Sequence, residues 1–454
     1  MSAALATTGT PSTRRLLSVL YVGVFMAALD TAVIAPAIPA LREAFGLDNR
    51  AVGLVMTTFI LFSLASTAPM ANLGDRHGRR PVYLASVFLF ALGSLLIALA
   101  PSFWLVLVGR AVQGVGGGGI VPTASAVIGD ALEPEPRGRA LGLMGAMYGM
   151  AFVLGPPFAG VVMVLASWQW IFLANLPIAA GLILLGARSL PVRTSSHALP
   201  PLDVAGIVVL FVMLAALVLG ITRVADTFVG ATWWPWLLWA ALALLAVLVA
   251  VERRAAQPII PLGLFGNRRL AVTYLLTAGA GFGMGSVIFL TSIATLGHGV
   301  DRAHAGFALL PMVLCSMIGS AGAGRLLQRA GPRALVLAGF ASMSLGYAAS
   351  AQADHGLVFF LVATMPVGLG VGIVVGGALR SVAIDEAPAS QRGAAQGLVN
   401  IFTSIGTLMS ATAVSAVADF AGGGLHGLLV AYVGVAALMA VMFVAAFGLG
   451  AKPR

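Results

Sequence analysis

Long apolar segments, repeated along almost the whole chain, constrain the fold of this sequence more than any other feature. Stretches of about 20 mostly apolar residues, the length of a helix that crosses a bilayer, recur between short polar loops. Only 9% of the 454 residues are charged and the mean hydropathy is +1.02, whereas a soluble domain carries about 25% charged residues. Because only lipid accepts so apolar an exterior, we expect an all-α polytopic membrane protein.

This criterion predicts about fourteen transmembrane helices. The run that begins at Leu16 is too long for the apolar part of a cleavable signal peptide, so we interpret it as the first span. A polar turn at Asp226–Thr232 separates two of the spans. The expected spans are Leu16–Leu41, Ala51–Leu73, Pro81–Ala100, Phe103–Ile128, Arg139–Leu165, Trp170–Leu190, Asp203–Val224, Trp233–Val251, Leu270–Leu296, Ala303–Leu327, Ala334–Ala351, Gly356–Ala378, Gly393–Phe420 and Leu425–Leu449.

Basic residues are distributed unevenly between the two sides of these spans. If the N-terminus is cytoplasmic, 20 of the 25 Lys and Arg residues, Arg380 among them, fall in cytoplasmic segments and 4 fall outside. The 7 tryptophans fall near the predicted outer interface. Positive loops favour the cytoplasm and tryptophan favours the membrane interface. We therefore expect a multi-pass protein of the bacterial cytoplasmic (inner) membrane with both termini in the cytoplasm.

Several other classes of protein do not fit the sequence. The net charge of +10 arises from short clusters rather than from a basic face for nucleic acid. The single cysteine, Cys315, excludes an internal disulfide and a cysteine-rich metal site. No nucleotide-binding glycine loop, zinc-protease signature, nucleophile elbow or channel filter is present. We expect neither an enzyme nor a bound cofactor or metal.

An internal repeat relates the two ends of the chain. Similar motifs recur at offsets of 253 to 255 residues: Ala71–Arg80 and Gly324–Arg333, Gly114–Gly118 and Gly368–Gly372, Arg137–Gly142 and Arg392–Gly397. Duplicated halves are typical of secondary transporters, and chance similarity between loops rich in glycine and arginine is the alternative. The repeat predicts two six-helix bundles, 1–190 and 268–454, joined by a linker at 191–267 with two additional transmembrane helices.

Five motifs carry a resemblance to a known family. They are Asp75-Arg76-His77-Gly78-Arg79-Arg80, the set Arg110, Gln113, Gly114 and Gly116, the stretch Gly155-Pro156-Pro157-Phe158-Ala159-Gly160, the triplet Leu29-Asp30-Thr31, and Trp168–Pro177. Together they resemble the major facilitator superfamily and, within it, the fourteen-span drug:proton antiporters. Ala71, Ala151 and Ala159 depart from the pattern, because they stand where glycine is usual.

The resemblance implies a major facilitator fold that works by alternating access. It implies a proton-coupled exporter of small hydrophobic or amphipathic compounds such as drugs, acting as a monomer among membrane lipids. Transport of a lipid or lipid-linked glycan on the same fold is the alternative.

Asp30 and Arg110 are the candidates for proton coupling. Of the 15 acidic residues, Asp30 alone lies well inside a predicted span, and such a residue is functional by default. Burial disfavours a charged carboxyl group while a nearby cation favours it, so such a group can load and release a proton. Asp30 lies roughly 21 Å from the inner face and Arg110 roughly 10 Å from the outer face, which are similar depths in a core about 30 Å thick. The alternatives are a permanently ionised Asp30 and an Arg110 that extends to the interface.

Two further groups of residues have expected conformational roles. We expect the loop of Asp75, Arg76, Gly78, Arg79 and Arg80 to hold one conformer closed on the cytoplasmic side, with simple charge topology as the alternative. Small residues allow close helix approach and proline kinks a helix. Either bending or static packing therefore explains Gly114, Gly116, Gly155, Pro156 and Gly160.

Candidate cargo contacts are polar or adaptable residues that could face a cavity. The second half has no acidic residue in mid-helix, which favours neutral or singly charged cargo. The candidates are Phe25, Met26, Tyr148, Asn175, Met284, Asn400 and Thr403.

Overall fold

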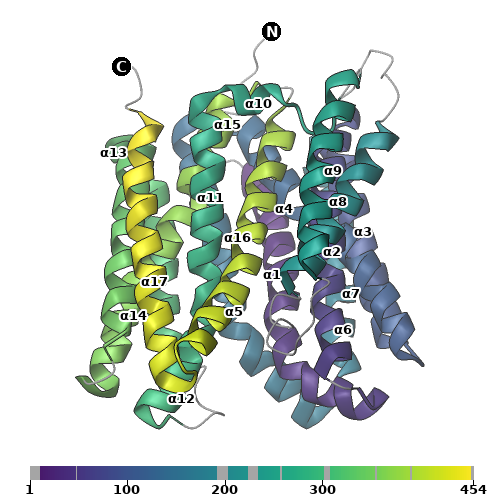
Figure 1. Ribbon diagram of the computed structural model, residues 1–454. Helices are drawn as coiled ribbons and strands as arrows, with labels where there is room; N and C mark the ends of the chain where they lie inside the picture. Colours follow the sequence, from purple (N-terminus) through teal and green to yellow (C-terminus); the bar gives the residue numbers. More distant parts are fainter. Residues whose placement is uncertain are drawn as a thin grey trace.

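The computed structural model is a bundle of helices that run side by side along one direction (Figure 1). It describes residues 11–47, 49–191, 203–222, 234–255, 258–300, 307–352, 355–388 and 391–450. Within these ranges every regular element is a helix. By their length and composition, 12 of these helical segments can cross a membrane. A helix satisfies its own backbone polar groups, which is what a lipid environment requires.

The first seven helices form one group. They are α1 (Pro11–Phe45), α2 (Asn49–His77), α3 (Arg79–Ala98), α4 (Phe103–Ala131), α5 (Pro134–Leu165), α6 (Gln169–Leu173) and α7 (Asn175–Ser189). Their core is apolar and includes the buried side chains of Leu20, Val87, Phe90, Ile120 and Phe172. We call α1–α7 the first half of the molecule.

The elements from α10 onward form the second group. They are α10 (Gly263–Gly266), α11 (Arg268–Ser286), η2 (Val287–Phe289), α12 (Leu290–His298), η3 (Phe307–Leu309), α13 (Leu310–Ser350), α14 (Gly356–Ile373), the π-helical η5 (Val374–Ala378), α15 (Leu379–Glu386), α16 (Arg392–Phe420), α17 (Gly424–Ala445) and η7 (Ala446–Leu449). A separate apolar core holds this group together, and Phe340, Met343, Tyr347 and Tyr432 lie at its centre. We call α10–η7 the second half.

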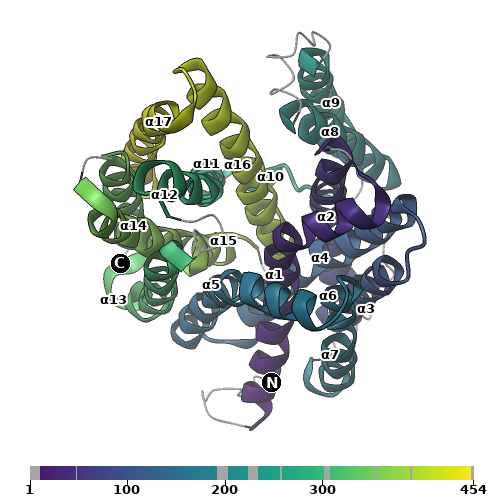
Figure 2. The same cartoon turned by 90° about the horizontal axis from the view of Figure 1, so that it is seen from below.

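Two additional helices lie outside both halves. Figure 2 shows α8 (Val204–Thr222) and α9 (Trp234–Arg254) as a pair beside α2 and away from α17. Leu210, Leu214 and Val218 of α8 share one buried apolar cluster with Leu64 of α2 and Ile401 of α16. Because α8 contacts both α2 and α16, the pair covers one side of the boundary between the two halves.

A glycine with positive φ ends one helix and begins the next in both halves. Gly78, between α2 and α3, has φ 94° and ψ 154°. Gly331, which is offset from Gly78 by 253 residues, has φ 74° and ψ 160° and divides α13 into two helical parts. A single straight helix of the 41 residues of α13 would be about 60 Å long, twice the thickness of a bilayer core. The internal repeat is therefore reproduced in backbone conformation.

The count of spans differs from the expected fourteen. The expected spans Arg139–Leu165 and Ala334–Ala351 correspond to α5 and to the part of α13 after Gly331, and neither is among the 12 candidates. The second of these is short, and positions 152, 153 and 156 of α5 lie outside the residues whose side chains the structure describes. Both are helical, but the fourteen-span count stays a prediction. The loop residues 192–202 and 223–233, in the expected linker, lie outside the described residues.

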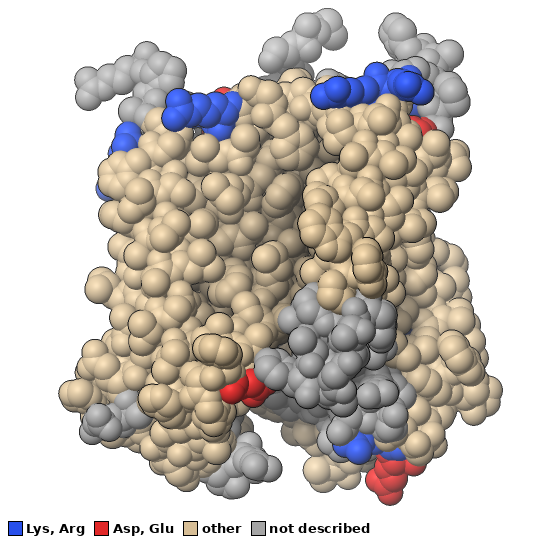
Figure 3. Space-filling view, viewed as in Figure 1, with Lys and Arg blue, Asp and Glu red and all other residues tan. Residues whose placement is uncertain are grey.

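Charged residues gather at one end of the molecule. Figure 3 shows Lys and Arg along the upper edge and a wide uncharged band below it. Large apolar side chains such as Leu184, Leu245, Leu345 and Val441 are exposed to the outside, as lipid contact requires. We call the upper end, where α10 and α15 lie in Figure 1, the basic end.

Candidate functional site

A buried ion pair occupies the interior of the first half. Asp30 of α1 is 1% exposed and Arg110 of α4 is 0% exposed. The Nη1 of Arg110 donates to Oδ2 of Asp30 at 2.8 Å. The similar depths estimated from the sequence therefore correspond to a direct contact. Because Arg110 points inward to Asp30, the alternative in which it extends to the membrane interface is wrong for this conformation.

Two neutral amide side chains complete the hydrogen bonding of Asp30, and Ser94 accepts from both of them. Gln113 Nε2 donates to Asp30 Oδ1 at 2.7 Å and to Ser94 Oγ at 2.9 Å. Asn175 Nδ2 donates to the same two acceptors at 3.4 and 3.2 Å. The carboxylate of α1 is thus held directly by donors from α4 and α7, while Ser94 of α3 orients the two amides. Sequence reasoning named Gln113 only as part of a motif and missed Ser94, and it placed Asn175 among the cargo contacts.

Arg110 makes further contacts with α2. Its Nε donates to the carbonyl oxygen of Val55 at 3.2 Å, and its guanidinium carbon lies 4.2 Å from the centre of the Phe59 ring. Arg110 Nη1 also donates to Gln113 Oε1 at 2.7 Å, while its buried Nη2 has no partner among the described residues. Burying a charge is costly unless it is paired and hydrogen-bonded. These contacts therefore stabilise an ionised pair in an apolar bundle.

A second group of polar contacts joins the two halves near the basic end. Arg137 of α5 pairs with Asp385 of α15. Arg392 of α16 donates to Asp130 of α4 at 3.3 Å. We call this region the seam. Each pair links one half to the other, so both pairs must break if the halves separate here.

The two ion pairs of the seam are related by the internal repeat. Arg137 corresponds to Arg392 and Asp130 corresponds to Asp385, each at an offset of 255 residues. Each arginine therefore reaches the acid of the opposite half. The sequence showed the repeated arginines but gave no indication that their partners are exchanged between the halves.

Asp75 adds a third connection across the seam. Its carboxylate pairs with Arg79 and accepts hydrogen bonds from the backbone N–H groups of Gly393 at 3.3 Å and Ala394 at 3.2 Å. Those N–H groups belong to the first turn of α16, where the helix dipole favours an anion. Arg79 also donates to Asp130 at 3.3 Å. Arg76 is buried and Arg80 is half-buried beside this group.

Close backbone contact of α5 with α13 and with η5 extends the seam inward. A Cβ atom added to Gly142 would lie 2.6 Å from the carbonyl oxygen of Ser320, and one added to Gly145 would lie 2.2 Å from Cα of Gly376. Ser320 Oγ donates to the carbonyl oxygen of Gly142 at 2.5 Å. Only glycine permits this approach between the halves.

The glycines singled out for a conformational role lie elsewhere. Gly114 packs on the backbone of Phe59 and Ser63 in α2, and Gly116 packs on Phe90 and Ser86 in α3. Gly155 contacts Ala32 of α1, and Gly160 has open space around it. These contacts are within the first half, which agrees with static packing in this conformation. The side chain of Pro156 lies outside the described residues.

Arg380 is a buried residue that the sequence placed wrongly. We expected a helix that ends at Ala378 and a cytoplasmic loop after it. Instead, the chain continues through the π-helical turn η5 into α15, and Arg380 is only 5% exposed. Its Nη2 donates to Asn400 Oδ1 at 2.8 Å and its Nη1 donates to Ser125 Oγ at 3.4 Å. A π-helical turn is often found at functional sites.

The expected cargo contacts have different surroundings. Asn400 binds Arg380, and Tyr148 of α5 lies close enough to interact electrostatically with Arg380. Met26 is fully buried in the core of the first half, so it does not face open space here. The half-buried residues of the expected set are Phe25, Tyr148, Met284, Asn400 and Thr403.

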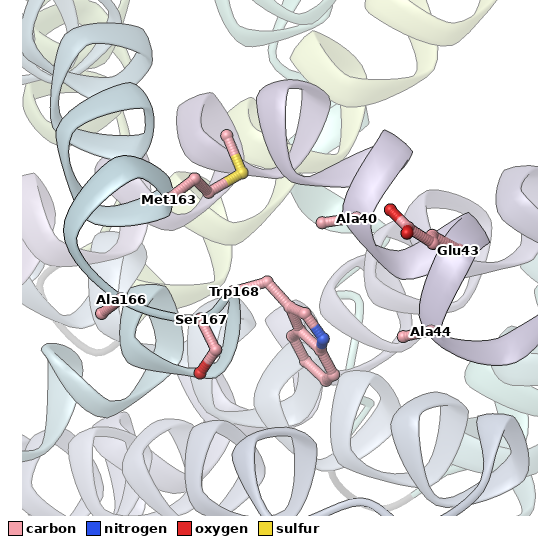
Figure 4. Close-up of a pocket in the computed structure, with 7 residues that line it drawn as sticks. All are labelled: Ala40, Glu43, Ala44, Met163, Ala166, Ser167 and Trp168. Carbon is pink, nitrogen blue, oxygen red and sulfur yellow. The ribbon is translucent and has the colours of Figure 1, made fainter.

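A surface hollow at the opposite end is separate from these groups. Figure 4 shows Glu43 of α1 and Met163 of α5 on opposite sides of it, with Trp168 below. Glu43 follows Asp30 by 13 residues in α1, which corresponds to roughly 20 Å. The hollow is therefore remote from the ion pair and from the seam.

The fold and the buried polar groups define a polytopic membrane transport protein with two related halves. The Major Facilitator Superfamily model matches residues 20–411. The chain belongs to this superfamily, whose members are transporters rather than enzymes.

Relatives agree with this assignment. The chain is 34% identical to the uncharacterized MFS-type transporter YfiU of Bacillus subtilis, over 87% of this chain and 78% of the relative. It is 29% identical to the multidrug transporter protein MdtP of Bacillus subtilis, over 90% and 76%. It is 30% identical to a triacylglyceride transporter of Mycobacteroides abscessus, over 86% and 79%. Among solved structures, the human organic anion transporter MFSD10 aligns with a TM-score of 0.72 at 17% identity, over 96% of this chain and 100% of that chain.

Proposed function

We propose that this protein is a proton-coupled antiporter that exports small hydrophobic or amphipathic compounds by alternating access. The observation that carries the proposal is the buried pair of Asp30 and Arg110. Ionisable residues inside a membrane commonly serve proton relays. The similarity to a multidrug transporter supports export of drug-like compounds.

We propose that the basic end faces the cytoplasm and that α5 and both parts of α13 also cross the bilayer. Positive residues favour the cytoplasmic side, and α13 is too long for one span. The arrangement is then fourteen spans in two bundles, 1–190 and 268–454, with the linker 191–267 between them. The protein acts as a monomer in the bacterial cytoplasmic membrane with both termini in the cytoplasm. Under this orientation the seam closes the cytoplasmic side.

In the proposed cycle, Asp30 carries the proton and Arg110 controls its release. A proton on Asp30 cancels its attraction to Arg110 and frees α1 to move relative to α4. The seam then opens, the proton leaves to the cytoplasm and cargo binds from the cytoplasm. The cargo leaves on the outer side after the seam has closed again. Since Asp30 is 1% exposed here, water reaches its carboxyl group only after the helices shift. The closed seam and the buried carboxylate thus occur together in this conformation.

Uphill transport by an Asp30→Asn variant tests this proposal. Proteoliposomes with an imposed pH gradient are supplied with a dye panel that includes rhodamine 6G and fluorescein. Wild-type protein accumulates at least one dye against its gradient, and Asp30→Asn does not. Glu43→Gln is the matched control, because it converts an exposed acid on the same helix to its amide.

The variant also has a folding cost that a second variant removes. Asp30→Asn leaves Arg110 buried without a carboxylate, which costs about 3–5 kcal/mol of stability. The double variant Asp30→Asn with Arg110→Gln removes both charges and keeps polar side chains in place. It should be more stable than Asp30→Asn and still bind dye without accumulating it. Undiminished accumulation by either variant means that the proton follows another route.

Lipid transport is the second candidate function, because the chain is 30% identical to a triacylglyceride transporter. The same proteoliposomes distinguish it when fluorescent triacylglycerol replaces the dyes. Proton-driven transfer of the lipid together with no accumulation of any dye would favour the lipid.

A further inference from the structure

Arg380 differs from Arg79, Arg110 and Arg137, three other buried arginines, in having no acidic partner among the described residues. Arg79, Arg110 and Arg137 are each less than a tenth exposed, and each forms an ion pair with an aspartate. Arg380 is 5% exposed, yet its side-chain partners in the described part of the chain are the neutral oxygens of Ser125 and Asn400. An uncompensated buried charge is strongly destabilising, so its retention within a transmembrane segment indicates a function.

The surroundings of Arg380 hold the guanidinium in place without neutralising it. The residue is the second after the π-helical turn η5, and its own carbonyl oxygen accepts from Gln396 Nε2 of α16 at 2.9 Å. Asn400, one turn further along α16, accepts from Nη2. Backbone and side chain are thus both fixed to α16.

Arg380 also lies on the boundary between the two halves. Ser125 belongs to α4 and Tyr148 to α5, whereas Arg380 and Asn400 belong to the second half. Arg380 is six residues before the end of α15 at Glu386, roughly 10 Å from the basic end. Substrate sites of transporters with duplicated halves lie at this kind of boundary.

We propose that Arg380 is a binding residue for an anionic group of an amphipathic cargo, such as a carboxylate, sulfonate or phosphate ester. This inference rests on the proposed function as an exporter and names the charge of its substrate. The planar guanidinium presents paired donors that match the oxygens of these groups. The anion supplies the negative charge that Arg380 lacks.

The contact with Ser125 explains how such cargo is released. When the seam is open, α4 has moved away and Nη1 of Arg380 is free to bind the anion. When the seam closes, Ser125 Oγ returns to 3.4 Å from Nη1. On closure, Ser125 Oγ therefore takes the place of the cargo's oxygen as the acceptor for Nη1, which weakens cargo binding when the seam is shut.

Binding of two dyes with the same ring system tests the charge preference. Fluorescein is anionic and rhodamine 6G is cationic, and both contain a xanthene ring. Binding to the purified full-length protein is measured by fluorescence polarisation at one fixed pH. Wild-type protein should bind fluorescein, and Arg380→Gln should bind it roughly 10- to 100-fold more weakly, the range of one or more hydrogen bonds to a charged group. Arg380→Lys, which keeps the charge and loses the planar fork, should be intermediate.

Arg325→Gln is the matched control, because it removes an exposed arginine from α13 of the same half. It should bind fluorescein as the wild type does. Retained rhodamine 6G binding by Arg380→Gln shows that this variant is folded; if it is not folded, Arg380→Lys alone carries the comparison.

Three outcomes would each overturn the inference. Fluorescein binding could be unchanged in both Arg380 variants, or Arg325→Gln could lose as much of it as Arg380→Gln does. The third outcome is wild-type protein that binds rhodamine 6G but not fluorescein. These outcomes leave the proposed function intact if rhodamine 6G still accumulates against its gradient. Absence of proton-driven accumulation of any dye would overturn the proposed function instead.

Discussion

Loss of the ion pair between Arg137 and Asp385 should open the seam. The side chain of Arg137 is 8% exposed and that of Asp385 is 31% exposed. Exposed pairs contribute about 0.2–1 kcal/mol, and breaking a fully buried pair costs about 3–5 kcal/mol. For this partly buried pair we expect Asp385→Asn to destabilise the closed seam by about 1–2 kcal/mol, which is a factor of about 5–30 in the equilibrium. If the open state holds about 1% of the population at rest, it should rise to roughly 5–20%.

Spin labels on opposite halves can report this change. His77 at the end of α2 and Arg329 near the bend of α13 are both exposed at the basic end. The chain has 1 cysteine, so Cys315→Ser gives a background for His77→Cys with Arg329→Cys. Pulsed electron spin resonance should show a new, longer distance between the two labels in Asp385→Asn. The charge-swapped variant Arg137→Asp with Asp385→Arg should return the distribution toward that of the wild type.

Glu386→Gln is the matched control for this experiment. Glu386 is adjacent to Asp385 and also pairs with an arginine, but that arginine is Arg269 of α11, in the same half. Its loss should leave the distance distribution unchanged. An unchanged distribution in Asp385→Asn, or an equal change in Glu386→Gln, would refute a role of the inter-half pair in closing the seam.

Three further predictions follow from the seam and from the repeated turns. Asp75→Asn should lower turnover several-fold without changing cargo affinity, because it weakens the contact with the first turn of α16; an equal loss of binding would indicate a cargo site or a folding defect. Gly142→Ala should prevent closure of the seam, since its Cβ would lie 2.6 Å from the carbonyl oxygen of Ser320. Gly160→Ala in the same helix should not, since its Cβ meets no described atom within 4 Å. Reaction of a cysteine at the seam with a membrane-impermeant reagent compares the two variants. Gly331→Ala should destabilise the protein by about 1–3 kcal/mol, because φ 74° and ψ 160° lie in a region that essentially only glycine adopts. Thermal unfolding, with Gly322→Ala as the control, measures this.

The sequence predicted features that depend on distance along a helix. Apolar length alone located the helices, because a bilayer sets the length of a span. Counting residues from the expected helix ends placed Asp30 and Arg110 at one depth, and the two side chains are in contact. The expected gating loop contains Asp75, whose carboxylate reaches α16. The first two inferences use only the rise per residue and the expected ends of the spans, and the third adds the charges of the loop at an expected helix end.

Features that depend on how helices rotate and continue were not predictable in the same way. Asn175 reaches Asp30, and Ser94 accepts from Asn175, because α7 and α3 turn those faces inward, and depth does not determine rotation. Arg380 was assigned to a loop because polar residues begin after Ala378, yet the π-helical turn carries the helix on to Glu386. The apolar residues Val382–Ile384, which follow Arg380 before the next acidic residues, were the signal that could have revealed this continuation.

Comparison of the two halves shows which contacts the internal repeat preserves and which it does not. The repeat preserves the positive-φ glycines Gly78 and Gly331 and the crossed ion pairs of the seam. It does not preserve the interior: at an offset of 254 residues, Asp30 corresponds to Met284, Arg110 to Thr364, and Arg380 to Ala126. The ion pair therefore exists only in the first half and the unpaired arginine only in the second. Since the seam contains residues of both halves, one closing movement acts on both sites at once. In the cycle that we propose, a proton on Asp30 would therefore alter cargo binding at Arg380 without any contact between the two residues.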